Sequence, residues 1–208
     1  MSNNRKEEIV LATIKLAAEY GLFSVSMSMI AEKVGIKKPS LYKHFASKEE
    51  IVEAVYEQIR NQAKENSSTV AIDYSALFQG KDALEILQKM VDGYIHMNRQ
   101  EQMYDFYKVI YAERSIQPVA ARIMAEETER MILATKQLFY AMEVHKKLHF
   151  RNADMSAVSF AMTIHGLMEY ALDRRALNDK AEDRRLINDY LQWFCEENAI
   201  EEGKADIQ

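Results

Sequence analysis

Residues 35–45, Gly35-Ile-Lys-Lys-Pro-Ser-Leu-Tyr-Lys-His-Phe45, form a short basic segment in an acidic protein. Five lysines and no acidic residue lie between Lys33 and Lys48, whereas the chain of 208 residues has a formal net charge of -5. Residues 1–47 hold seven Lys and Arg against four Asp and Glu, and residues 48–208 hold 20 against 28. Opposite charge in two parts of one chain predicts two different roles.

The residues around this segment predict two short helices joined by a tight turn. Ser26 is placed to cap a helix over residues 27–34, and Gly35 ends that helix after two turns. Pro39 suits the first turn of a second helix, about 39–45, because a missing N–H needs no partner there. Two short helices with a glycine turn have the dimensions of a helix-turn-helix, whose second helix enters the major groove of DNA.

The second helix divides into an inner and an outer face. Leu41 and Phe45 lie one turn apart, so we expect both to face inward, against the apolar residues of 30–36. The outer side chains suit DNA, since lysines neutralise phosphates and hydroxyls donate to phosphate oxygens or base edges. A solvated lysine-rich face is the competing interpretation of the charge alone.

The whole chain predicts an all-α fold of about nine helices, because glycine and proline are scarce and apolar residues recur at helical spacing. One helix covers about 5–20, with a buried stripe that ends at Tyr20. A capping box at residues 47–50 opens a helix over about 48–65. Helical periodicity fades over residues 66–80, and five more helices follow. The first has an apolar stripe that starts at Leu84, and the second has a stripe over Tyr104–Tyr111. The other three cover Pro118 to about Lys147, about 153–172 and about 182–198.

The pattern Gly21-x4-Ser26-x3-Ile30-Ala31-x2-Val34-Gly35-Ile36, then Ser40-Leu41-Tyr42-x-His44-Phe45-x2-Lys48-Glu49, resembles the DNA-binding domain of the TetR/AcrR repressor family over about the first 60 residues. The resemblance implies a homodimer that binds a palindromic operator in double-stranded DNA. It implies a DNA-binding domain at 1–47, a connecting helix at 48–66 and a ligand-binding and dimerisation domain at 67–208. Lys37 replaces a frequent serine and Pro39 a frequent glycine, which leaves the operator sequence open. Together, motif and resemblance predict DNA contacts from Ser26, Lys37, Lys38, Pro39, Ser40, Tyr42, Lys43, His44 and Lys48.

The C-terminal part holds nine of the twelve methionines and 15 of the 20 aromatic residues. A stripe of such residues at helical spacing is ordinary core in most helices, but polar groups threaded among them are typical of a ligand pocket. His165 and Glu169 are one turn apart in an otherwise apolar helix. They are either a buried pair that satisfies its own hydrogen bonds or contacts to a ligand. The residues predicted to bind a small apolar or amphipathic effector are Tyr94, His96, Met97, Tyr107, Tyr111, Met131, His165 and Glu169.

Apolar residues on more than one face of the last two long helices predict a homodimer packed through them. The resulting hypothesis is a transcriptional repressor released from its operator by the effector. A second hypothesis makes the C-terminal part a dimerisation and protein-partner module without a ligand.

A third hypothesis is a helical enzyme or metal protein that uses His145 and His149, whose spacing is that of a zinc pair on a helix. No glutamate follows the first of these histidines, so we expect no metal, no cofactor and no catalytic residue. The single Cys195 fits a buried thiol in a reducing compartment. The sequence has no membrane-length apolar run and no secretory pattern, and we therefore expect a cytoplasmic protein.

Overall fold

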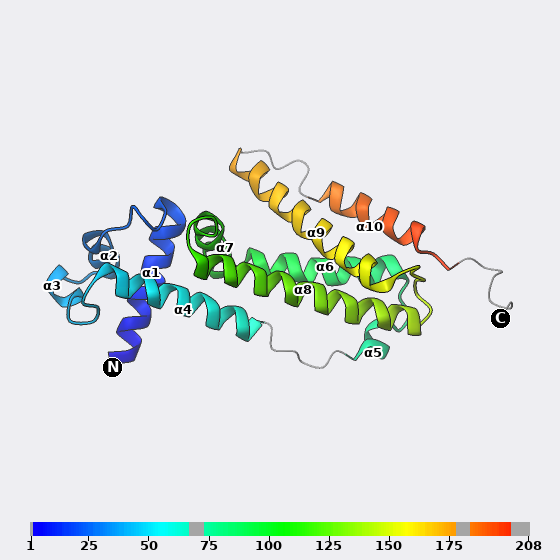
Figure 1. The fold of residues 1–208 in the computed structure, drawn as a ribbon, viewed down its shortest axis with the longest axis horizontal. Coiled ribbons are helices and arrows are strands. Elements are labelled where there is room, and N and C mark those ends of the chain that lie inside the picture. Colours follow the sequence, from blue (N-terminus) through cyan, green and yellow to red (C-terminus); the bar gives the residue numbers. More distant parts are fainter. Residues whose placement is uncertain (1, 67–72, 178–183, 201–208) are drawn as a thin grey trace. The chain divides into compact units, whose positions relative to one another are not determined.

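The computed structural model describes residues 2–66, 73–177 and 184–200, and the regular secondary structure of these residues is entirely helical (Figure 1). The all-α prediction is therefore confirmed. The described residues form ten helices: α1 (Ser2–Tyr20), α2 (Met27–Val34), α3 (Lys38–Leu41), α4 (Lys48–Asn66), α5 (Tyr74–Phe78), α6 (Ala83–Arg99), α7 (Glu101–Glu113), α8 (Pro118–Val144), α9 (Ala153–Ala176) and α10 (Arg185–Glu197).

The helix that the sequence did not predict is α5. It has five residues and is capped by Asp73, whose carboxylate accepts the N–H of Ala76 at 3.2 Å. Phe78 at its C-terminal end is 2% exposed and packs in the core of the C-terminal helices. A helix of little more than one turn is too short to show a 3.6-residue period, so the pattern read as a boundary.

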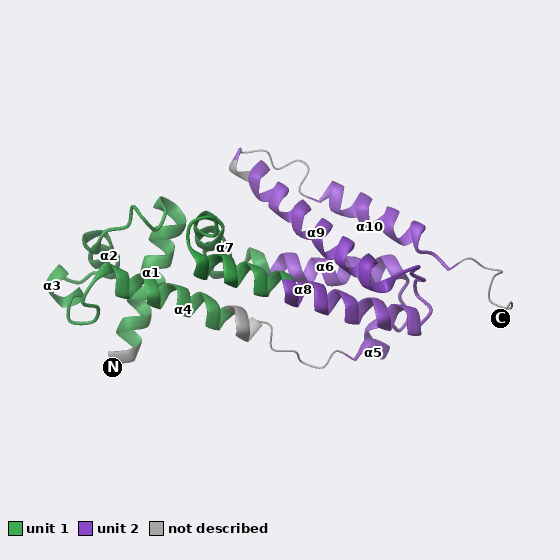
Figure 2. Ribbon diagram, in the orientation of Figure 1, with its two compact units in different colours: residues 1–68, 98–128 green, residues 69–97, 129–208 purple. Residues whose placement is uncertain are grey.

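The chain forms two compact units (Figure 2). Unit 1 comprises residues 1–68 and 98–128, and unit 2 comprises residues 69–97 and 129–208. Helices α1 to α4 belong to unit 1 together with α7 and the first part of α8. The compact units thus group the chain differently from the division at residue 66, which concerned function and remains a prediction.

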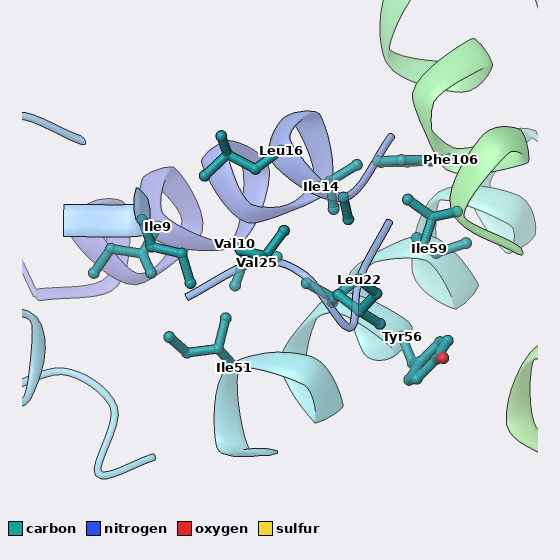
Figure 3. Packing of buried hydrophobic residues seen from close by; sticks show 14 of the residues in the cluster. Ile9, Val10, Ile14, Leu16, Leu22, Val25, Ile51, Tyr56, Ile59 and Phe106 are labelled. Atoms are coloured by element: carbon teal, nitrogen blue, oxygen red, sulfur yellow. The ribbon is translucent and has the colours of Figure 1, made fainter. Parts of the chain in front are cut away.

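The core of unit 1 lies among α1, α2, α4 and α7 (Figure 3). Helix α1 packs against the other three, and α7 contributes Phe106, Val109 and Ile110, each at most 2% exposed. The predicted stripe of α1 is buried as far as Ala17, but Tyr20 at its end is 51% exposed, so the prediction for Tyr20 was wrong. The helix stops one residue later, at Gly21, before another element can cover that side chain.

The core of unit 2 is built around aromatic rings. The ring of Phe139 stacks on Phe150 with centroids 4.5 Å apart, and its centroid lies 5.3 Å from Phe160 and 5.4 Å from Phe194. All four side chains are at most 5% exposed. Burying four aromatic side chains stabilises the unit strongly, since each removes on the order of 150–250 Å² from water. Much of the aromatic surplus of the C-terminal part is therefore core.

Candidate nucleic-acid interface

Helix α2 begins at a capped residue. Ser26 has an extended backbone, and its Oγ accepts the N–H of Met29 at 3.2 Å. This hydrogen bond satisfies one of the free N–H groups at the helix start and confirms the predicted cap. Because the oxygen accepts this bond, the hydroxyl hydrogen of the exposed Ser26 can still be donated to an approaching acceptor.

The turn between α2 and α3 depends on Gly35. Its backbone lies in the left-handed region, with φ 73° and ψ 30°, as predicted for a glycine that ends a helix. The N–H of Gly35 donates to Glu32 O at 3.0 Å, and the N–H of Ile36 donates to Ala31 O at 2.9 Å. These two bonds satisfy carbonyls at the end of α2 and set the direction in which the chain enters α3.

Helix α3 is shorter than predicted but keeps the predicted inner face. Regular helix ends at Leu41, and a turn continues to Phe45, whose N–H donates to Leu41 O at 3.1 Å. Leu41 is fully buried and Phe45 is 3% exposed. The inward position of both residues is therefore confirmed. They hold the basic segment to the core from one side only.

The predicted DNA contacts lie on the other side of this segment. Lys37, Lys38, Pro39, Tyr42 and Lys43 are exposed, and Ser40 and His44 are half-buried. Five of these seven side chains thus face solvent within a stretch of seven residues. Their contact with DNA remains a prediction from the sequence. Their chemistry suits DNA, because the lysine ammonium groups can bind phosphates and the tyrosine and serine hydroxyls can donate hydrogen bonds.

Lys48 is the first residue of α4 and is already engaged within unit 1. Its Nζ donates to the carbonyl oxygen of Phe23 at 2.7 Å and lies 5.8 Å from the centroid of the Phe23 ring. An ammonium group has three donors, so one bond to a carbonyl leaves two for a phosphate. This contact joins the turn before α2 to the start of α4, and Phe23 was not among the residues that the sequence singled out.

The start of α4 carries the predicted capping box with a shift of one residue. The N–H of Glu50 donates to Ser47 Oγ at 3.3 Å, as expected. The Glu50 carboxylate accepts the N–H of Ala46 at 2.6 Å, rather than that of the capping serine itself. The reciprocal bonds fix the N-terminus of α4, where Lys48 lies.

A hollow of about 800 Å³ is present in unit 1, chiefly between α1 and α4. Its lining includes the carboxylates Glu7, Glu50, Glu53 and Glu57, with Lys6 as the basic group. A surface dominated by carboxylates repels phosphate, so this hollow does not extend the basic surface.

Helix α7 is tied to α1 by an ion pair. Lys15 Nζ lies 2.8 Å from Glu101 Oε1, near the first turn of α7. The hydrogen bond and the charge of Glu101 raise the pKa of Lys15, and Lys15 in turn lowers the pKa of Glu101. The two residues are 86 positions apart, and each is too ordinary in its local context to give a sequence signal.

The predicted effector-binding residues fall in both compact units. Tyr107 and Tyr111 belong to unit 1, where their rings lie 6.0 Å apart and the Arg114 guanidinium lies 4.3 Å from the Tyr111 ring. The other predicted residues belong to unit 2; of these His96 is exposed and the rest are half-buried: Tyr94, Met97, Met131, His165 and Glu169.

Two members of the unit 2 group meet. His165 Nε2 and Glu169 Oε1 are 3.5 Å apart on α9, with side chains 16% and 34% exposed. The pair expected from the sequence spacing is thus present in a mostly apolar part of the helix. Its role in binding an effector remains a prediction.

The histidines of the metal hypothesis make separate contacts. The His145 ring meets the Phe78 ring edge-on, with centroids 5.2 Å apart, and His149 Nδ1 lies 3.7 Å from Glu143 Oε1. Among the described residues, no three His, Cys, Asp or Glu side chains are grouped so that they could hold a metal ion. Burial raises the pKa of the Cys195 thiol to about 11, which keeps it protonated and a poor nucleophile at neutral pH.

Residues 9–55 match the profile of a protein family described as bacterial regulatory proteins, tetR family. Over 151 residues the chain is 26% identical to an uncharacterized HTH-type transcriptional regulator, YerO, of Bacillus subtilis (strain 168). That match spans 73% of this chain and 46% of the other, so this chain covers about half the length of its curated relative.

Solved structures with the same fold cover almost the whole chain. One is assigned to the TetR-family transcriptional regulators of Mesorhizobium loti MAFF303099, with a TM-score of 0.68 and 21% identity over 96% of this chain and 99% of that one. Another, assigned as a transcriptional regulator of Saccharomonospora viridis and crystallised with choline, has a TM-score of 0.67 and 19% identity over 97% of this chain and 100% of that one.

The matched residues 9–55 include most of α1, all of α2 and α3, and the start of α4. They therefore contain the capped helix, the left-handed glycine turn and the basic segment described above. None of the described helices is long and apolar enough to cross a membrane. The sequence profile and the helix-turn-helix geometry agree that residues 9–55 match the tetR family of bacterial regulatory proteins.

Proposed function

We propose that the protein is a transcriptional repressor that binds a palindromic DNA operator as a homodimer and leaves it when a small effector binds. The observation that carries the proposal is the segment from Lys37 to Lys43, which is anchored by a fully buried Leu41 and turns four basic or hydroxyl side chains to solvent. A surface that is positive in an acidic protein is suited to phosphate, because the acidic remainder is repelled by DNA and favours one docking orientation.

The proposed docking places α3 in the major groove. The compact residues at its N-terminal end, Pro39 and Ser40, allow close approach to base edges, and the lysines on either side reach the phosphates that border the groove. Lys48 and Ser26 contact phosphates from the starts of α4 and α2. The protein would act in the cytoplasm, because the bacterial chromosome lies there.

A homodimer supplies the second α3 that a palindrome requires. The exposed residues Met155, Met162, Gly166 and Tyr170 recur at intervals of seven and four on α9, so they share one face of that helix. A Cβ at Gly166 would meet no atom within 4 Å, which leaves room for close approach of another helix. On α10, Leu186 is 40% exposed and Trp193 is 53% exposed, also seven residues apart. These faces support the proposed pairing of α9 and α10 with their copies.

The dimer interface has a built-in reporter, because Trp193 is the single tryptophan of the chain. On dilution through the dissociation range, its emission should shift to longer wavelength as the indole becomes exposed to water. Met162→Glu places a charge on the proposed interface. This variant should dissociate into monomers at a higher protein concentration than the wild type, as measured by sedimentation. Gln102→Glu, an exposed position on α7, is the matched control and should not. Equal behaviour of the two variants would contradict an interface through α9.

Effector binding is proposed for unit 2. The His165–Glu169 pair offers a donor and an acceptor, and half-buried Tyr94, Met97 and Met131 supply apolar or aromatic surface. A mostly apolar site with a few polar groups is what a small amphipathic molecule needs. A protein of the same fold from Saccharomonospora viridis was crystallised with choline, which supports the capacity of the fold to hold a small molecule.

The operator is to be found by selection from sheared genomic DNA of the source organism. Purified protein is mixed with the fragments at low salt, bound DNA is sequenced, and a palindromic duplex is synthesised from the enriched sites. We expect enrichment of one palindrome, with loss of binding in Lys43→Ala and retention in Lys89→Ala, an exposed lysine on α6. Uniform recovery of all fragments, or equal loss in the two variants, would contradict the proposal.

A further inference from the structure

The turn between α1 and α2 displays one aromatic side chain to solvent. Gly21 has φ 79°, and its carbonyl accepts the N–H of Ser24 at 3.1 Å, which closes a turn with Leu22 and Phe23 at its centre. Leu22 and Val25 on either side point into the core and are 5% and 1% exposed (Figure 3). Phe23 is consequently directed outward and is 94% exposed.

The exposed ring is joined to a basic group of the proposed DNA surface. Lys48 Nζ donates to Phe23 O at 2.7 Å and lies 5.8 Å from the ring centroid. The ammonium is thereby held next to the ring by a hydrogen bond and a cation–π attraction. Two residues that lie 25 positions apart thus present one apolar surface and one charge side by side.

The surroundings of the ring are polar. Ser24 and Ser26 are exposed in the same turn, and Lys48 borders the ring from α4. A protein partner that binds through the hydrophobic effect requires a contiguous apolar patch, and a single ring among hydroxyls and an ammonium does not provide one. A sugar–phosphate backbone matches this composition better, because it alternates an apolar deoxyribose face with an anionic phosphate.

We propose that Phe23 is a DNA contact, whose ring packs on a deoxyribose next to the phosphate that Lys48 binds. This rests on the proposed function, since it names a further residue of the same interface. The ring would cover one side of the ammonium–phosphate contact and exclude water from it, which strengthens the attraction between the charges. The bond from Lys48 to Phe23 O holds the ammonium in place before DNA arrives, so less side-chain freedom is lost on binding.

The test compares Phe23→Ala and Phe23→Tyr with Ile116→Ala by titration of the selected operator duplex at fixed salt. Ile116 is the matched control, an apolar residue of unit 1 that is 73% exposed and follows α7. We expect Phe23→Ala to weaken binding about three- to tenfold, as for loss of an apolar ring that is about half buried on binding. Phe23→Tyr, which keeps the ring, and Ile116→Ala should stay within about twofold of the wild type, as for surface changes outside an interface.

Two further measurements separate a contact from a structural effect. The dependence of affinity on salt should be unchanged in Phe23→Ala, because no charge is removed, and should become shallower in Lys48→Ala. In the double variant the two losses should not add, because the residues act on the same phosphate. The temperature of unfolding of Phe23→Ala should equal that of the wild type, since the ring is nearly fully exposed.

Retention of wild-type affinity by Phe23→Ala, while Lys43→Ala binds weakly, would overturn the role of Phe23 and leave the DNA-binding function intact. Loss of affinity with a matching loss of stability would also overturn it, by making Phe23 a structural residue. If the wild-type protein itself selects no DNA, the proposed function fails first. The proposal is supported only by weaker binding at full stability.

Discussion

The glycines Gly35 and Gly93 allow one chemical change to be made with opposite consequences for stability. Gly35 ends α2 at φ 73°, where an alanine side chain is disfavoured by about 1–2 kcal/mol. Alanine also reduces the freedom of the unfolded chain, which offsets part of this cost. An added Cβ would meet no atom within 4 Å, so no clash contributes. The Gly35→Ala variant should therefore lose about 1 kcal/mol of unfolding free energy.

Gly93 is exposed within α6, and a Cβ there would also meet no atom within 4 Å. Alanine favours the helix interior over glycine by about 1 kcal/mol, so Gly93→Ala should gain this amount. The two variants should differ by about 2 kcal/mol when these two contributions are combined. Gly35→Asn should recover part of the loss at the turn, because asparagine accepts the left-handed region more readily than alanine.

Urea unfolding followed by helical circular dichroism measures these differences, with the midpoint compared at constant slope. Gly35→Ala should unfold at lower and Gly93→Ala at higher urea concentration than the wild type. A shift of both urea midpoints in the same direction would refute the reasoning. It would mean that the backbone conformation of the glycine does not decide whether alanine stabilises or destabilises the protein.

The remaining predictions concern buried groups. Leu41→Ala should cost about 2–5 kcal/mol of unfolding free energy, because Leu41 is fully buried. Tyr42→Ala should change the unfolding free energy by less than about 0.5 kcal/mol. Equal losses for the two variants in urea unfolding would mean that the inner and outer faces of α3 are wrongly assigned. Burial, and then the nearby charge of Glu113, raises the pKa of Tyr56 to about 12. Between pH 10 and 12 the unfolded chain loses this proton while the folded protein keeps it, so stability should fall as pH rises, and Tyr56→Phe should make the fall shallower; an unchanged alkaline unfolding profile would contradict this. With its pKa raised to about 11, Cys195 should react with a disulfide reagent at pH 8 about tenfold more slowly than a thiol of pKa 9, because the smaller thiolate fraction is partly offset by the greater nucleophilicity of the more basic thiolate. A rate in the native protein equal to the rate in urea would argue against a protected thiol.

Local backbone rules accounted for the helix-turn-helix. Ser26, Gly35 and the pair Ser47 and Glu50 act over one helical turn, so residue type and spacing define their roles. The structure has Ser26, Gly35 and the Ser47 cap in place, and the return bond of Glu50 is shifted by one residue to Ala46. The same holds for the inward spacing of Leu41 and Phe45, which are buried as the period required.

Features that depend on distant residues were not predictable in this way. Lys15 and Glu101 are 86 positions apart in the sequence, and α7 packs against α1 through its apolar side. The exposure of Phe23 was equally hidden, because a turn residue between Leu22 and Val25 is directed outward only by the course of the chain.

The sequence distinguishes the basic segment more sharply than the predicted effector-binding residues. Its charge contrasts with the rest of the chain and its helices are short. Aromatic and methionine residues suit either a core or a pocket, and residue type does not separate Phe139, which is buried among rings, from half-buried Tyr94.

The most direct test of DNA binding through this surface is the salt dependence of affinity for the selected palindrome. Lys37, Lys38, Lys43 and Lys48 on two subunits would neutralise about eight phosphates, which predicts a slope of about -7 for the logarithm of affinity against the logarithm of salt. A rise from about 50 to 200 mM salt should then weaken binding about 10⁴-fold. Lys43→Ala should make the slope shallower by about two, one for each subunit, and Lys89→Ala should leave it unchanged. A wild-type affinity that does not depend on salt, or an identical slope in Lys43→Ala, would contradict the account.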